Sequence, residues 1–137
     1  MMNKLQFFNF CREQESKFSP GFRHVEGAVR MNSNESAAHF RTKAIVMWYM
    51  KRWDFVPADL SDVVCEGAKL TRKDLPKWYS ARVYSEVRVG NSVWDIVAFT
   101  IYGTFVFEIV ESESEESLKR KERAAMNLGW AFEKVYC

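Results

Sequence analysis

The sequence predicts an α+β domain in which a mixed central sheet is flanked by helices. Residues 82–112 contain three short strand-like runs separated by two tight turn signals, which is the pattern of an antiparallel meander. Apolar residues at helical spacing precede the meander at 35–53, and a helical segment at 117–128 and a last apolar run at 130–136 follow it. A strand that returns through a helix can lie parallel to its neighbour, so both strand orientations are expected in one sheet.

The chain has 137 residues, enough for one domain with a sizeable core. We expect a single domain over 1–137, with the core at about 33–137 and an N-terminal extension at 1–32. Hydrophobic residues make up 47% of the chain and aromatic residues 15%, which excludes disorder. The sequence is therefore that of a globular protein.

Net charge, cysteine content and the absence of long apolar runs indicate what kind of globular protein this is. The net charge of +2 does not indicate a nucleic-acid binder by itself, although the basic residues are clustered. Cys11, Cys65 and Cys137 fit neither a zinc spacing nor an even disulfide set. No run reaches the length of a membrane span. These features predict a cytoplasmic protein with free thiols and no membrane partner.

The ends of the predicted helices follow from periodicity and from cap residues. Residues 3–15 are predicted to form a short helix with Leu5 and Phe8 turned inward and Phe7 as a further inward candidate. The other helix ends follow from capping rules. They are an N-cap at Ser33 or Asn34, an N-cap at Ser114, and a stop at Gly129.

The turns of the meander fix the expected strand registers. With Gly90-Asn91 as a two-residue hairpin turn, Glu86 lies opposite Asp95. With Tyr102-Gly103 as the second turn, Asp95 lies opposite Val110. Side chains two residues apart share a face of a strand. One face is therefore expected to carry Glu86, Asp95 and Glu108, with Val110 beside them.

Three carboxylates on one face need a compensating charge. Like charges opposed across strands are destabilising, and an unpaired carboxylate among apolar neighbours is costly. A cation is therefore expected over the cluster, and oxygen ligands favour Mg²⁺ or Mn²⁺. Glu35, His39 and Lys43 form one stripe of the preceding helix. That stripe is either a solvated row with two ion pairs or a row facing the acidic cluster, where Glu35 or His39 supplies a further ligand.

The order helix, three-strand meander, helix, strand, with acids at these places, resembles the PD-(D/E)XK nuclease superfamily, the restriction-endonuclease-like fold. The resemblance lies in Asp95 at the start of the second strand and in Glu108-Ile109-Val110 in the third, supported by Glu86 and Glu35. It covers about residues 33–137. The acidic run that follows the third strand and leads into a basic helix is similar to small archaeal or viral nucleases and Holliday-junction resolvases.

The resemblance implies a metal site. Asp95 and Glu108 would ligate one or two divalent ions, with the backbone carbonyl of Ile109 as a further ligand. The family places a lysine two residues after the glutamate, but this chain has Val110 there. The replacement candidates are Lys119 and Lys121 on the following helix and Lys43 on the preceding one. Glu111 has the opposite parity to Glu108 and is expected to face away.

The function implied is that of a Mg²⁺- or Mn²⁺-dependent DNA endonuclease acting on phosphodiester bonds, including those of branched or repair intermediates. The alternatives are a catalytically inactive nucleic-acid-binding module on the same fold and a protein that uses the fold for interaction alone. Symmetric cutting of two strands favours a homodimer. A gene carried by a virus or plasmid, with the protein acting in the host cell, fits the same resemblance. The predicted nucleic-acid contacts are Lys43, Arg72, Lys73, Lys77 and Arg120.

Overall fold

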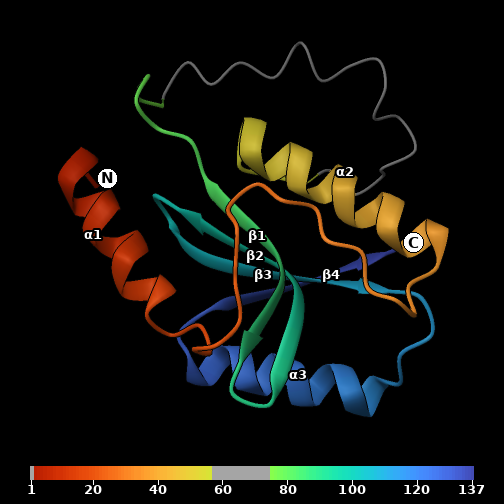
Figure 1. Cartoon of the computed structure of the whole chain (residues 1–137). Coiled ribbons are helices and arrows are strands. Elements are labelled where there is room, and N and C mark those ends of the chain that lie inside the picture. The colour runs from red at the N-terminus through yellow and green to blue at the C-terminus, as the bar shows by residue number, and fades with distance from the viewer. Residues whose placement is uncertain (1, 57–74) are drawn as a thin grey trace.

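The structure, a computed structural model, describes residues 2–56 and 75–137. Its sheet has four strands in the order β1-β2-β3-β4. The first three pair antiparallel, and β4 is parallel to β3, as predicted for a strand that returns through a helix (Figure 1). The strands are β1 (Arg82–Val89), β2 (Ser92–Thr100), β3 (Gly103–Val110) and β4 (Ala131–Tyr136).

Helices pack against this mixed sheet in the part of the chain that the structure describes. They are α1 (Lys4–Glu15), α2 (Ala37–Trp53) and α3 (Glu115–Asn127). In Figure 1, α2 lies on one side of the sheet and α3 on the other, and α1 lies beside the sheet at its far end from the C-terminus. The predicted order of helix, meander, helix and strand is confirmed. No helix within the described ranges is long and apolar enough to cross a membrane.

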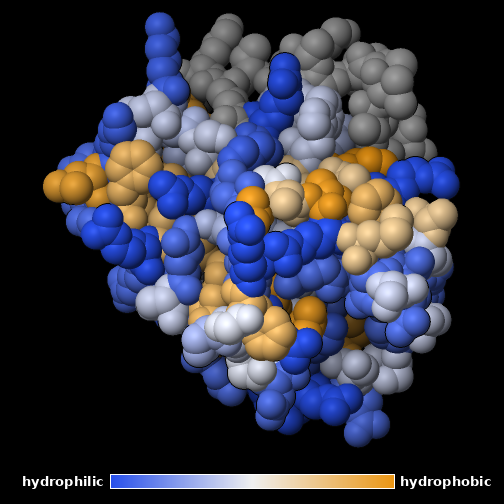
Figure 2. Space-filling model, in the orientation of Figure 1, coloured by the Kyte–Doolittle hydropathy of each residue, from blue (hydrophilic) through white to orange (hydrophobic). Residues whose placement is uncertain are grey.

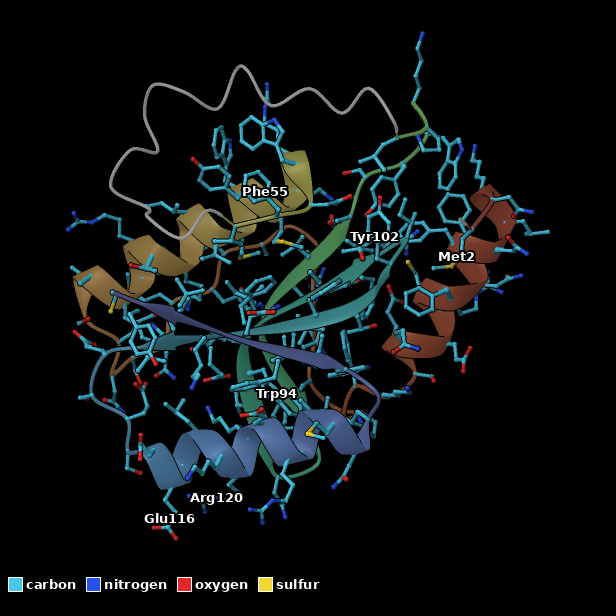
Figure 3. All side chains as sticks on the ribbon, turned by 180° about the vertical axis from the view of Figure 1, so that it is seen from behind. Met2, Phe55, Trp94, Tyr102, Glu116 and Arg120 are labelled. Carbon is cyan, nitrogen blue, oxygen red and sulfur yellow. The ribbon has the colours of Figure 1, made fainter. Side chains whose placement is uncertain are left out.

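The core lies between the sheet and its helices. Trp94 lies between the sheet and α3 in Figure 3, and its ring contacts that of Trp130 edge-on at 5.5 Å. In α1 the buried aromatic is Phe7. The prediction that Leu5 and Phe8 face inward is wrong, because Leu5 is 69% exposed and Phe8 is 40% exposed. Hydrophobic side chains accordingly reach the surface over α1 (Figure 2).

Two of the three predicted helix ends are confirmed. Ser114 caps α3 by accepting a hydrogen bond from the backbone N–H of Ser117. After α3, Gly129 has a φ of +75°, and Trp130 N donates to the carbonyl of Ala125, which closes the helix. The predicted cap of α2 is wrong. The N-cap is Ser36, whose Oγ accepts from the backbone N–H of His39.

The first hairpin register is confirmed, with Val89 opposite Ser92. The second turn is Ile101-Tyr102, because Thr100 pairs with Gly103. The Oγ1 of Thr100 explains this choice, since it donates to the carbonyl of Gly103 and accepts from Tyr102 N, and these bonds tighten the turn one residue early. The register of β2 on β3 is thus shifted by two residues from the predicted one, which keeps the predicted alternation of faces as far as Ile96 and Phe107, where the pairing ends.

Candidate metal and ion-pair site

The sheet forks between β2 and β3 at the two acids that carry the family resemblance. Backbone pairing of these strands ends at Ile96 and Phe107. One step further, Asp95 lies opposite Glu108, so the predicted pairing of Asp95 with Val110 is wrong. The side chains continue the ladder here. Asp95 N donates to Glu108 Oε1 at 3.1 Å, and Ile109 N donates to Asp95 Oδ2 at 2.8 Å.

Glu108 is buried in this fork and forms an ion pair with a lysine of α3. The residue is 1% exposed, and its Oε2 accepts a hydrogen bond from Lys121 Nζ at 2.9 Å. Lys121 also donates to the carbonyl of Val93 at 3.2 Å, so it bridges α3 and β2. Burial, with a smaller contribution from the charge of Asp95, raises the pKa of Glu108 to about 7, although Lys121 opposes the rise. A strongly perturbed carboxylate of this kind is a feature of functional sites.

On the α2 side the fork opens into an acidic hollow of about 310 Å³. Glu86 and Asp95 line it, as their predicted shared face requires. Glu108 lies outside this lining, because its carboxylate points to Lys121 of α3, which covers the other side of the sheet (Figure 1). The prediction of one face for all three acids is therefore correct for two of them. The full lining is Asn32, Asn34, Glu35, Ser36, His39, Glu86, Asp95, Glu111, Ser112 and Glu113.

The stripe formed by Glu35, His39 and Lys43 faces the sheet, so its interpretation as a solvated row is wrong. His39 and Lys43 lie on α2, and Glu35 lies just before its N-cap, Ser36. His39 Nδ1 contacts Glu35 Oε1 at 2.5 Å, and its Nε2 lies 3.4 Å from Asp95 Oδ2. Burial alone would lower the pKa of His39, but the hydrogen bond to Glu35 and the charge of Asp95 outweigh it and raise that pKa. For Glu35, burial would raise the pKa, but the hydrogen bonds from Lys43, from the backbone of Asn32 and from His39 together outweigh it and lower the pKa.

Lys43 is the centre of this arrangement. It is 0% exposed, and its Nζ lies 2.8 Å from Glu35 Oε1 and 2.9 Å from Glu86 Oε1. Glu86 reaches it from a left-handed backbone conformation, with a φ of +50°. Such a conformation costs on the order of 1–2 kcal/mol in a residue with a Cβ, so the surrounding contacts must hold it in place. The ammonium of Lys43 is thus enclosed by carboxylates and is not presented to nucleic acid.

Glu111 was expected to face away, and this prediction is wrong. The parity rule ends with β3 at Val110, and Glu111 turns back over the hollow, where Ser36 Oγ donates to its carboxylate at 2.9 Å. Sequence reasoning also missed Glu113, whose Oε2 accepts from Glu111 N at 2.8 Å. Burial would raise the pKa of Glu113, but this bond and the other backbone hydrogen bonds to its carboxylate, such as that from Ser112 N, together lower it. The only sequence signal for both residues is the acidic run directly before the Ser114 cap.

The remaining predicted contacts are dispersed. Lys119 and Arg120 are exposed on α3, where Figure 3 shows Glu116 and Arg120 pointing away from the sheet. Lys77 is exposed just before β1. Arg72 and Lys73 lie outside the described residues. Of the candidate replacement lysines, Lys121 is the one that contacts Glu108.

The donor set decides which ion this site suits. No group of three or more His, Cys, Asp or Glu side chains in the described ranges is arranged to hold a metal. Mg²⁺, however, is commonly bound by one or two carboxylates together with substrate phosphates, and not by an all-protein cage. The carboxylates that could contribute to such a set are Asp95 and Glu108, which already accept hydrogen bonds from Ile109 N, Asp95 N and Lys121. Glu35 and Glu86 are paired with Lys43 instead.

Comparisons of the chain with protein-family models, with curated proteins and with solved structures find no match.

Proposed function

We propose that this protein is a divalent-metal-dependent DNA endonuclease built on a restriction-endonuclease-like core. The observation that carries the proposal is the fork, in which Asp95 and Glu108 of adjacent strands meet and Glu108 holds a lysine. The order of the helices and strands supports the same fold. Because fold alone does not determine activity, the argument depends on the chemistry of this pair.

Asp95 and Glu108 would bind Mg²⁺ or Mn²⁺ together with the carbonyl of Ile109. The bound ion would polarise a phosphate and lower the pKa of an attacking water. The raised pKa of Glu108 means that this carboxyl exchanges its proton near neutral pH. A metal ion requires the carboxylate form of Glu108. That form is therefore populated at physiological pH, although burial and the charge of Asp95 disfavour it.

Lys121 takes the part of the lysine that is missing at Val110. An ammonium group has three N–H donors, and two of them go to Glu108 Oε2 and the carbonyl of Val93. These two bonds fix the position of Nζ. The third donor would remain for a phosphate oxygen or for the attacking water, where a positive charge would stabilise the transition state.

Cleavage of supercoiled plasmid and of four-way junction DNA in Mg²⁺ tests the proposal. Asp95→Asn and Glu108→Gln should abolish cleavage while DNA binding persists, because only the ion and its ligands are affected. Lys121→Met should lower the rate about 10²-fold or more, the usual loss when one stabilising donor is removed. Lys134→Met is the matched control, since it removes an exposed lysine of β4. Full activity of all three site variants would refute the assignment.

The catalytically inactive alternative is favoured by one observation, the near-complete burial of Glu108 under Lys121. On this hypothesis the pair is a structural ion pair and the protein binds DNA without cutting it. Salt-dependent DNA binding without cleavage in either Mg²⁺ or Mn²⁺ would select it. Absence of DNA binding at low salt would instead favour a protein that uses the fold for interaction alone.

A further inference from the structure

Lys43 is the buried charged group that the proposed cleavage does not use. Its Nζ lies within 3.0 Å of both oxygens of Glu35 and 2.9 Å from Glu86 Oε1. The side chain is fully enclosed, whereas a lysine is normally among the most exposed residues. A buried ammonium is retained only when it is paired and hydrogen-bonded, and here one carboxylate just before α2 and one from β1 do both.

The ammonium of Lys43 occupies the place that a metal cation would take between carboxylates from two separate segments of the chain. Glu86 adopts the left-handed conformation at the position from which its carboxylate reaches Lys43. His39 links the same group to the fork, since it contacts Glu35 on one side and Asp95 on the other. The acids next to Asp95 are thus already paired with the ammonium of Lys43 and the ring of His39.

We infer that Lys43 is a permanent internal counter-ion that substitutes for a second divalent cation, so that the site binds a single metal ion at Asp95 and Glu108. The inference rests on the proposed function, because it concerns the same metal site. A second ion next to Glu35 and Glu86 would have to displace a fully buried positive charge. The two carboxylates are therefore closed to metal for as long as Lys43 is present, and Lys43 acts as a positioning residue.

The test is the number of Mn²⁺ ions bound per chain, measured by equilibrium dialysis and calorimetry. Wild type should bind one. Lys43→Met should bind two, because its removal leaves Glu35 and Glu86 without a counter-charge. In EDTA this variant should melt on the order of 10 °C below wild type, and Mn²⁺ should restore most of the loss. Lys134→Met, the same replacement at an exposed lysine, should bind one ion and melt like wild type.

A neutral variant keeps the inference testable if the single replacement is poorly folded. Lys43→Met combined with Glu35→Gln and Glu86→Gln removes all three charges, so it should fold without metal and bind one ion. Two ions bound to wild type, or no additional ion in folded Lys43→Met, would overturn the inference. So would a Lys43→Met protein that stays unfolded in Mn²⁺ while the neutral variant folds.

Failure of the proposed function gives a different result. Asp95→Asn with Glu108→Gln should remove the ion of the wild type and leave the additional ion of Lys43→Met in place. If the wild type binds no ion and Lys43→Met binds one, the endonuclease assignment is wrong and the counter-ion role of Lys43 is supported.

Discussion

The stability of the metal-free protein should fall as the pH rises, and Glu108 is the reason. Its pKa is raised from the ordinary value of 4.5 to about 7 by burial and by Asp95. Between these pH values the folded state keeps the proton of Glu108, while the unfolded state has lost it. Unfolding therefore releases a proton, and a higher pH favours unfolding.

The magnitude follows from the span between the two pKa values. About 2.5 pH units at about 1.4 kcal/mol each correspond to a loss of stability on the order of 3 kcal/mol, which begins above pH 4.5 and is complete above pH 7. Glu108→Gln isolates this contribution, because the amide resembles the protonated acid and does not titrate. Contributions of other groups, such as Glu35 and His39, largely cancel in the comparison.

Urea unfolding in EDTA at several pH values between 4.5 and 8 measures the effect. The free energy of unfolding of Glu108→Gln should rise relative to that of wild type by about 3 kcal/mol across this range. Mn²⁺ should stabilise wild type more at pH 8 than at pH 5, because the ion binds the carboxylate. A difference between the two proteins that does not change with pH would refute the assignment of a neutral, buried Glu108 to the folded state.

Two substitutions test the left-handed residues. Glu86→Ala should lower the free energy of unfolding by about 3 kcal/mol, because it removes a carboxylate from buried Lys43, whereas Glu86→Asn should cost about 1 kcal/mol less, since asparagine tolerates a positive φ. An alanine variant at least as stable as the asparagine variant in urea unfolding would contradict this reasoning. Gly129→Ala should cost about 1–2 kcal/mol through backbone strain alone, because the added Cβ would meet no atom within 4 Å. Unchanged thermal stability of Gly129→Ala would show that the helix end can rearrange.

The order and type of the elements could be predicted because they depend on periodicity along the chain. The alternation in β1 and the helical spacing in α2 are local, and both were readable. The inward face of α1 was readable only in part, because Phe7 was one of three apolar candidates and only the position of the sheet distinguishes it from the exposed Leu5 and Phe8. The Ser36 cap was missed for a similar reason, since Ser33 and Asn34 are equally good caps in isolation.

For the candidate site, the clustering of the acids could be predicted, but their ion-pair partners could not. An error of two residues in the second register left Asp95 and Glu108 together, whereas an error of one would have separated them, so the clustering was a robust prediction and the pairing was not. The partners come from α2 and α3, and the strand registers do not determine where these helices pack. Lys121 and Lys43 were both among the candidates in the sequence, yet Lys43 is enclosed by Glu35 and Glu86 and Lys121 contacts Glu108. The two lysines lie on helices that pack on opposite sides of one sheet, so only the packing of these helices assigns each lysine to its carboxylates.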